Sequence, residues 1–460
     1  MRDSGESGGE HGAGEDDLGA KVAGRAASAC TPEPPRRAKR PWWLPHFLGR
    51  VPIGLDARYV NLVGLVALAS LFENYDLSVL SSAMKQIREG FGLEQGAFTS
   101  LMAWTRLGAV PGFFVLPIAD RFGRRRVFLG AIVGMSVGTV LSAFAPTAAS
   151  FVALQTLTRS FVIASMATAV VIVAEELPAR HRGWGIGLLG AIGSLGYGLG
   201  ALLYAFVDVL PGGWRALYLA GCAPLFLLPM FRRRIPETGR FLSMRSTRAA
   251  GDGSAAFFGP MFELLRAYPA RSLGVAAMAT SVALGSSPAF TLLSDFVQTT
   301  HGWTPSAYST MAILAGMFGI VGNPAMGWAA DRFGRRPVAM AGFGLFPVAA
   351  FALYFGPSMA VPIVWVPFVF LLTGANVLMR IIASELFPTS SRNTAMGWET
   401  LAETLGASLG FFVVGLATAA DASIAPAAVA VASLTALGAI VVWALPETAG
   451  RELEATSRVE

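Results

Sequence analysis

The sequence predicts an all-α membrane protein with twelve transmembrane helices in two six-helix bundles. The 460 residues are 54% hydrophobic and 14% charged, whereas soluble domains carry about 25% charged residues. A membrane-spanning helix needs about 20 mostly apolar residues, and twelve such stretches follow one another along the chain. A charged motif also recurs after nearly half the chain length, which indicates a duplication.

The twelve stretches divide evenly between the two halves. In the first half they lie at 59–82, 97–119, 126–145, 150–173, 183–207 and 214–232. In the second half they lie at 271–297, 306–330, 337–356, 361–383, 393–417 and 425–445. We expect bundles at 51–235 and 271–447, a cytoplasmic loop at 236–270, and cytoplasmic tails at 1–50 and 448–460. The first tail is rich in Gly, Ser, Glu and Pro, so we expect it to be disordered.

Basic residues set the orientation. The loops on one side hold only Lys85, Arg88 and Arg215, whereas most of the 35 Lys and Arg residues fall on the other side. The positive-inside rule identifies that basic side as the cytoplasm. We therefore expect a multi-pass protein of the plasma or inner membrane, with both termini in the cytoplasm.

Three motifs occur twice in register. One run recurs 211 residues later, as Asp120-Arg121-Phe122-Gly123-Arg124-Arg125 and Asp331-Arg332-Phe333-Gly334-Arg335-Arg336. At an offset of 210, Glu175 and Arg182 match Glu385 and Arg392. The same offset aligns Pro236-Glu237-Thr238 with Pro446-Glu447-Thr448. Two parallel six-helix repeats are a known plan of secondary transporters.

Through these motif pairs, the chain after residue 55 resembles the major facilitator superfamily, and most of all its sugar-porter and metabolite:proton symporter branch. The resemblance implies alternating access, with charged groups at the cytoplasmic helix ends that pair when the transporter faces outward. This implied gate comprises Asp120, Arg121, Gly123, Arg124, Arg125, Glu175, Arg182, Glu237, Asp331, Arg332, Gly334, Arg335, Arg336, Arg380, Glu385, Arg392, Glu399 and Glu447. The family's packing glycine, four residues before the motif Asp, is present at Gly327 but is replaced by Leu116 in the first copy.

Ionisable residues within the spans mark a second group of candidates, because such residues are rare in membranes and usually functional. Glu73 and Asp76 lie three residues apart and so share a helix face. Arg106 and Arg159 each lie about 14 Å from the outer ends of their spans, at 1.5 Å per residue. The resemblance implies that Asp76 carries the proton and that Arg159 is its partner, with Glu73 as the second choice. A purely structural ion pair is the alternative.

The second half offers further candidates. Glu399 and Glu403 lie four residues apart, and Glu403 is nearer the middle of the membrane, so we expect it in the substrate cavity. Asn376 and Trp398 also suit that cavity, although helix packing is the simpler interpretation of such residues. Asp295, near an outer loop, is expected to be solvated.

Other classes of protein fit the sequence poorly. It contains no GxxxxGK[ST] phosphate-binding run and no nucleophile motif, so we expect no enzyme. Two distant cysteines and four scattered histidines indicate neither a metal site nor a cofactor. The basic residues occupy short loops rather than one continuous patch, which argues against nucleic acid.

We therefore expect a monomeric secondary transporter that moves a small polar or anionic metabolite, such as a sugar or organic acid, with protons through the lipid bilayer. An efflux antiporter is one alternative, but the Gly-Pro signature of that group is missing because no proline lies between Pro178 and Pro211. A non-transporting sensor is another, disfavoured by the short tails. The stretch 283–288 lacks the Gln-Gln pair of hexose porters, so the substrate stays open.

Overall fold

The computed structural model describes Pro41, Leu44 and residues 51–113, 118–119, 122–239, 259–388, 391–420 and 423–449. Contacts divide the chain into a short N-terminal unit, which ends at Val60, and a second unit that begins at Asn61. The described part of the first unit comprises a turn at Ile53 and Gly54 and the start of helix α2 (Ala57–Ser82). All the features discussed below belong to the second unit.

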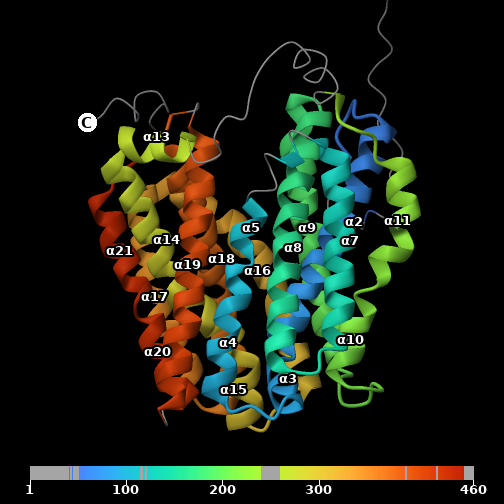
Figure 1. Ribbon diagram of the computed structural model, residues 1–460. Helices are drawn as coiled ribbons and strands as arrows, with labels where there is room; N and C mark the ends of the chain where they lie inside the picture. The colour runs from blue at the N-terminus through green and yellow to red at the C-terminus, as the bar shows by residue number, and fades with distance from the viewer. Residues whose placement is uncertain are drawn as a thin grey trace, which may run out of the picture. The chain divides into compact units, whose positions relative to one another are not determined.

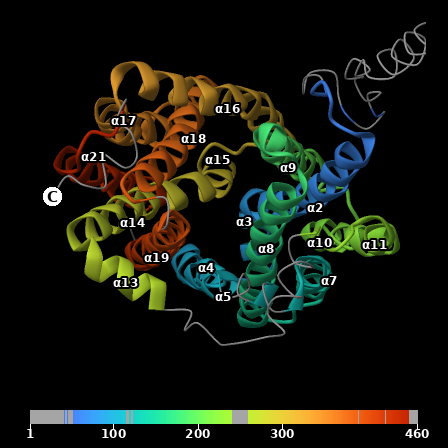
Figure 2. The same cartoon turned by 90° about the horizontal axis from the view of Figure 1, so that it is seen from above.

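The described part of the second unit is helical throughout, with turns between the helices. After α2, the first half contains α3 (Met84–Gly90), α4 (Gln95–Leu107), α5 (Ala109–Phe113), α7 (Arg124–Ala143), α8 (Ala148–Glu176), α9 (Arg182–Tyr204), α10 (Trp214–Ala220) and α11 (Ala223–Arg234). The second half contains α13 (Gly259–Ala267), α14 (Pro269–Thr291), α15 (Leu293–Thr300), α16 (Pro305–Phe333), α17 (Arg335–Phe355), α18 (Val361–Glu385), α19 (Arg392–Ala419), α20 (Ile424–Ala432) and α21 (Thr435–Ala444). Seen from above, the two sets gather on opposite sides (Figure 2).

Eleven helices or helix pairs in the described residues are long and apolar enough to cross a membrane. They correspond to eleven of the twelve predicted spans. The remaining span, 97–119, is formed by α4 and α5, which are separated at Gly108. Gly108 lies directly against the Thr156 carbonyl of α8, so a side chain there would collide with backbone. The predicted all-α architecture of two six-helix bundles is confirmed.

Glycines allow several helices to pack backbone against backbone, as is common in membranes. Gly196 of α9 contacts the backbone of Leu71 on α2, and Gly406 of α19 contacts the backbone of Thr280 on α14. The same device joins the two halves. Gly96 of α4 lies against Ala419 of α19, and Gly415 of α19 lies against Ser100 of α4.

The two ends of the helix bundle differ, and we name them by their residues. The motif end holds the starts of α7 and α17 and the residues that follow α21. The far end holds α3 and α15, which lie at the bottom of Figure 1, whereas the C-terminal label lies near its top. At the motif end, Gly123 and Gly334 precede α7 and α17 with φ angles of 104° and 99°. Residues with a Cβ atom rarely adopt such angles, which explains the glycine in both motif copies.

Candidate functional site

The first motif copy forms a polar cluster within its own half. The Nη2 atom of the buried Arg124 lies 3.3 Å from Glu175 Oε1, and Thr238 Oγ1 donates to Glu175 Oε2 at 2.6 Å. The backbone N–H of Arg125 donates to Glu237 Oε1 at 3.0 Å. Glu175 and Glu237 thus hold the start of α7 against the ends of α8 and α11. Asp120 and Arg121 lie outside the described residues.

The second motif copy forms a corresponding cluster. Arg335 binds Glu385 through two nitrogens, at 3.1 and 3.2 Å, and also pairs with Asp331. Thr448 Oγ1 donates to Glu385 Oε2 at 2.6 Å. Arg335, the first residue of α17, is therefore fixed from two sides.

Glu447 caps the N-terminus of α17. It accepts hydrogen bonds from the backbone N–H groups of Arg335 at 2.9 Å and of Arg336 and Thr448 at 3.0 Å. Partial burial acts to raise the pKa of Glu447, but the backbone N–H groups of Ala449, Arg336, Arg335 and Thr448 outweigh it, and the pKa is lowered. A negative charge at a helix N-terminus is also favoured by the helix dipole.

Four other predicted gate residues form no contact between the halves among the described residues. Arg182 and Arg392 each donate to a backbone carbonyl nearby, of Leu177 and Ser384 respectively. Arg332 lies beside its neighbour Phe333, and Arg380 is exposed on α18. Every ion pair that the described residues form at the motif end joins groups of the same half.

The packing role expected for Gly327 is not seen in this conformation. A Cβ atom on Gly327 would meet no other atom within 4 Å, so no helix lies against it. Its counterpart Leu116 lies outside the described residues.

Inside the membrane, the two acids of α2 have different surroundings. Glu73 is 0% exposed, and neither carboxylate oxygen has a hydrogen-bond partner, although the hydroxyls of Ser70 and Ser165 lie nearby. Asp76 Oδ1 accepts a hydrogen bond of 2.7 Å from Thr139 Oγ1 on α7. An unpaired carboxylate is strongly disfavoured in such surroundings, so Glu73 is expected to be neutral.

Arg159 of α8 and Arg106 of α4 lie close enough to repel each other, and each is only half-buried. Asp76 and Glu403 attract Arg159, yet among the described residues it forms no salt bridge or hydrogen bond. Arg106 reaches into the second half, where its Nη2 atom donates to Thr291 Oγ1 at 2.9 Å. Two accessible, unneutralised guanidinium groups are a suitable binding site for an anion.

Aromatic rings line the same region, and the sequence did not single them out. The guanidinium of Arg106 lies 5.0 Å from the centre of the Phe411 ring on α19. Tyr197 of α9 and Phe290 of α14 face each other across the two halves with ring centres 6.2 Å apart. Phe290 in turn stacks on Trp365 at 5.7 Å. A lone aromatic residue in an apolar span is indistinguishable from packing in a sequence, so only their convergence reveals them.

The remaining predicted cavity residues lie on α18 and α19. Glu403 is half-buried and interacts electrostatically with both Arg106 and Arg159. Asn376 is half-buried on α18. Trp398 donates from Nε1 to the Ser272 carbonyl of α14 at 2.8 Å, which favours a packing role. Glu399, expected at the gate, is instead 0% exposed.

The far end contains an ion pair between the halves that the sequence did not predict. Arg88 of α3 binds Asp295 of α15 through Nε at 3.1 Å and Nη2 at 3.2 Å. Asp295 is 0% exposed, so the expectation that it would be solvated is wrong. α15 packs against α3 of the first half, and the Asp295 carboxylate is enclosed at this contact. The scarcity of charges on this side was the available signal, because Arg88 has few other partners there.

Beside the Arg88–Asp295 ion pair, uncharged polar side chains also join the two halves at the far end. Gln86 of α3 donates to Gln298 of α15 at 2.8 Å, and Gln298 donates to the Tyr204 hydroxyl of α9 at 2.7 Å. The Tyr204 hydroxyl donates back to Gln86 at 2.9 Å. The far end is therefore closed by polar contacts between the two halves.

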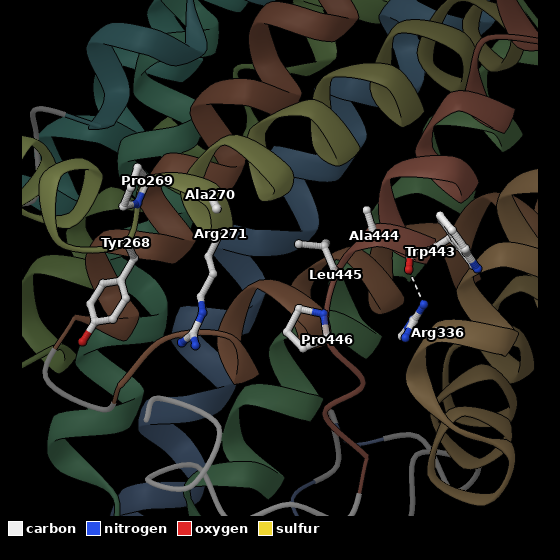
Figure 3. A pocket seen from close by; sticks show the side chains of 9 residues that line it. All are labelled: Tyr268, Pro269, Ala270, Arg271, Arg336, Trp443, Ala444, Leu445 and Pro446. Carbon is white, nitrogen blue, oxygen red and sulfur yellow. Dashed lines mark hydrogen bonds between the residues drawn. The ribbon is translucent and has the colours of Figure 1, made fainter. Parts of the chain in front are cut away.

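A cavity of about 570 Å³ lies elsewhere, at the motif end of the second half (Figure 3). It is bounded by Tyr268, Arg271, Arg336, Trp443 and Pro446, and Figure 3 shows the Arg336 guanidinium at the Trp443 carbonyl. All its lining residues belong to one half. The two arginines, in contrast, lie where the first half meets the second.

Two bundles of membrane-spanning helices, with charges buried between them, define a membrane transporter for small molecules. The family model of the major facilitator superfamily matches residues 66–288 and 272–460, and the chain belongs to this family.

Relatives of known name and solved structures agree with this assignment. The chain is 30% identical to a gallate transporter of Pseudomonas putida, over 76% of this chain and 84% of that protein. It is 26% identical to the 4-hydroxybenzoate transporter PcaK of Acinetobacter baylyi, over 78% and 84%. Its fold resembles a D-xylose-proton symporter, with a TM-score of 0.69 at 19% identity, covering 86% of this chain and all of that one. It equally resembles an inward-open form of XylE from E. coli, with a TM-score of 0.69 at 18% identity, over 86% and 98%.

Proposed function

We propose that the protein is a proton-coupled symporter that carries an aromatic carboxylate across the membrane by alternating access. The observation that carries the proposal is the pair of half-buried arginines, Arg106 and Arg159, beside the buried acids of α2 and the aromatic rings between the halves. The gallate and 4-hydroxybenzoate relatives, named for aromatic acids, support the same class of substrate.

Each part of the site suits one part of such a substrate. An arginine binds a carboxylate through two parallel hydrogen bonds, which assigns the carboxylate to Arg106 and Arg159. Aromatic pairs favour stacked or edge-on contacts at 4.5–7 Å, so the substrate ring would lie among Tyr197, Phe290 and Phe411. A sugar has neither feature, whereas a hydroxylated benzoate has both.

Proton coupling rests on Asp76. Without a substrate, Asp76 and Arg159 attract each other but form no salt bridge. A substrate carboxylate on Arg159 would compete for that arginine, and Asp76 would then be stabilised in its protonated form. Binding of the anion and binding of the proton therefore favour each other, as symport requires.

Alternation follows from the difference between the two ends. The far end is closed by Arg88, Asp295 and their neighbours, whereas the motif-end ion pairs stay within their own halves. With the basic motif end in the cytoplasm, this conformation faces inward. We propose that the motif-end groups, Asp331 and the exposed Arg380 among them, pair across the halves when the protein faces outward. Plasma- or inner-membrane location and a monomeric state belong to this proposal.

The test is uptake of labelled 4-hydroxybenzoate and gallate into proteoliposomes with an acid exterior, corrected for entry into protein-free liposomes. We expect accumulation that follows the imposed pH gradient. Cyclohexanecarboxylate keeps the carboxylate without the aromatic ring, and 4-hydroxybenzyl alcohol keeps the ring without the carboxylate, so neither should compete well. Accumulation of D-xylose instead, or no response of any aromatic acid to the gradient, would refute the proposal.

A further inference from the structure

A second carboxyl group is enclosed in the opposite half of the protein. Glu399 of α19 is 0% exposed and lies seven residues, or about 10 Å, from the motif-end start of its helix. Its Oε2 atom accepts a hydrogen bond of 3.2 Å from the neighbouring Thr400 hydroxyl, and its Oε1 atom has no partner.

The charges around Glu399 do not stabilise its ionised form. Glu403, one turn away on α19, carries the same charge and repels it. Arg380 of α18 attracts it, but the arginine side chain is exposed and forms no salt bridge with it. No other charged group, from α14, α4 or the other helices packed against α19, acts on it strongly among the described residues. An enclosed carboxyl group without a counter-ion takes up a proton, because an unpaired charge is very unfavourable there.

Glu399 is separate from the acid pair of α2. Glu73 and Asp76 lie on α2 in the first half, whereas Glu399 lies on α19 in the second half. The charges that act on Asp76 include Arg159, whereas those that act on Glu399 are Glu403 and Arg380. Apart from Asp295, which pairs with Arg88, each half therefore contains a buried acidic site that forms no salt bridge among the described residues.

We propose that Glu399 is a second proton-binding site, so that two protons accompany each aromatic carboxylate. This inference rests on the proposed function. Glu403, half-buried beside both arginines, is the path by which the proton reaches Glu399 from the substrate site. At the motif end, Arg380 can turn onto the Glu399 carboxylate, which stabilises the ionised form and releases the proton to the solution on that side.

The charge balance makes the proposal testable. One monovalent anion with two protons carries one net positive charge, whereas an anion with one proton carries none. We therefore expect wild-type proteoliposomes to generate an inward current with 4-hydroxybenzoate. At zero membrane potential, the ratio of internal to external 4-hydroxybenzoate should rise tenfold when the pH difference increases by about 0.5 unit. Glu399→Gln should keep uptake but lose the current, and its accumulation should rise tenfold per whole pH unit.

The matched control is Glu263→Gln, the same chemical change at an exposed position of α13, which should behave as the wild type. Current-free uptake driven by the pH gradient in the wild type would overturn the second site and leave the proposed function intact. An unchanged current in Glu399→Gln would also overturn it. Absence of gradient-driven uptake in the wild type would overturn both.

If Glu399→Gln is folded but inactive, infrared spectroscopy of the purified protein tests the proposal. The C=O band of a protonated carboxyl group in the wild type should lose intensity in the variant relative to Glu263→Gln. A band that is identical in both variants would overturn the proposal.

Discussion

Arg106 combines a long-range hydrogen bond with an aromatic contact. It donates to Thr291 and lies over Phe411, and both partners belong to the other half. Arg106 therefore connects the two halves at the position where we propose that the substrate carboxylate binds.

Arg106→Lys is expected to weaken substrate binding despite the retained charge, because lysine cannot offer two parallel N–H groups. Loss of such a bond raises KM by about 10- to 100-fold, which corresponds to about 1.5–3 kcal/mol. Initial uptake rates over a range of 4-hydroxybenzoate concentrations measure the effect. Arg126→Lys, at an exposed position, is the control. An unchanged KM would remove Arg106 from the substrate site.

Asp76→Asn is expected to abolish concentrative uptake and to spare exchange of labelled for unlabelled substrate. Asparagine keeps an oxygen for the Thr139 hydrogen bond but cannot gain or lose a proton. Counterflow in proteoliposomes measures exchange, and pH-driven accumulation measures coupling. Glu73→Gln, made in parallel, shows which acid of α2 is essential. If Asp76→Asn still accumulates substrate, Asp76 is not the proton carrier, and the role would be assigned to Glu73.

At the scale of single elements, the start of α17 is held by three carboxylates of its own half. Arg335 is bound by Glu385 and Asp331, and Glu447 closes the helix N-terminus. At the start of α7, Arg124 pairs with Glu175, and the backbone N–H of Arg125 donates to Glu237. Both motif copies thus attach the start of a helix to carboxylates of neighbouring segments.

The lowered pKa of Glu447 predicts a pH dependence of stability. Its ionised form is stabilised by the folded protein, so its contribution is complete above the ordinary value of 4.5 and is lost as the pH falls through the lower folded value. Glu447→Gln should lower the melting temperature at pH 7 and reduce its further decline below about pH 4.5. Thermal unfolding in detergent at a series of pH values measures this. If the melting temperatures of Glu447→Gln and the wild type fall identically at acid pH, Glu447 does not make this contribution to stability. Glu263→Gln is the control.

At the scale of the whole molecule, the Arg88–Asp295 pair should control which end is open. Asp295→Asn removes the carboxylate that binds Arg88 through two nitrogens and leaves the arginine with the exposed Glu89 at 3.9 Å, at a cost of about 1.5–3 kcal/mol. The equilibrium should move toward the state with an open far end. Arg88→Gln should shift this equilibrium in the same direction. In the double variant the equilibrium should be closer to that of the wild type, because neither charge is left without its partner.

Thiol labelling measures this shift. In a background with both Cys30→Ser and Cys222→Ser, Thr99→Cys places the only thiol at a buried position of α4 near the far end. Labelling by an impermeant reagent from that side should accelerate about tenfold or more in Asp295→Asn. Equal rates in all variants would show that the pair does not close this end.

The architecture, and the contacts among residues of the duplicated motifs, could be predicted from the sequence. The paired motifs led to Glu175 and Glu237 as groups near Arg124 and Arg125, and these contacts are present. Asp295 was misjudged because its burial depends on α15 packing against α3 of the other half. Phe290 and Tyr197 were missed because their meeting joins distant helices, and the enclosure of Glu399 depends on how α18 and α19 pack. Such information lies in tertiary contacts rather than in local periodicity.

The contacts of Gly96 with Ala419 and of Gly415 with Ser100 have a consequence for the energy supply of the cell. Such close contacts leave no room for a file of water molecules between the two helices at these positions. Protons travel along such files, so we expect the contacts between α4 and α19 to oppose a proton leak where the two halves meet. In the proposed symporter, they would help to ensure that protons cross together with the substrate.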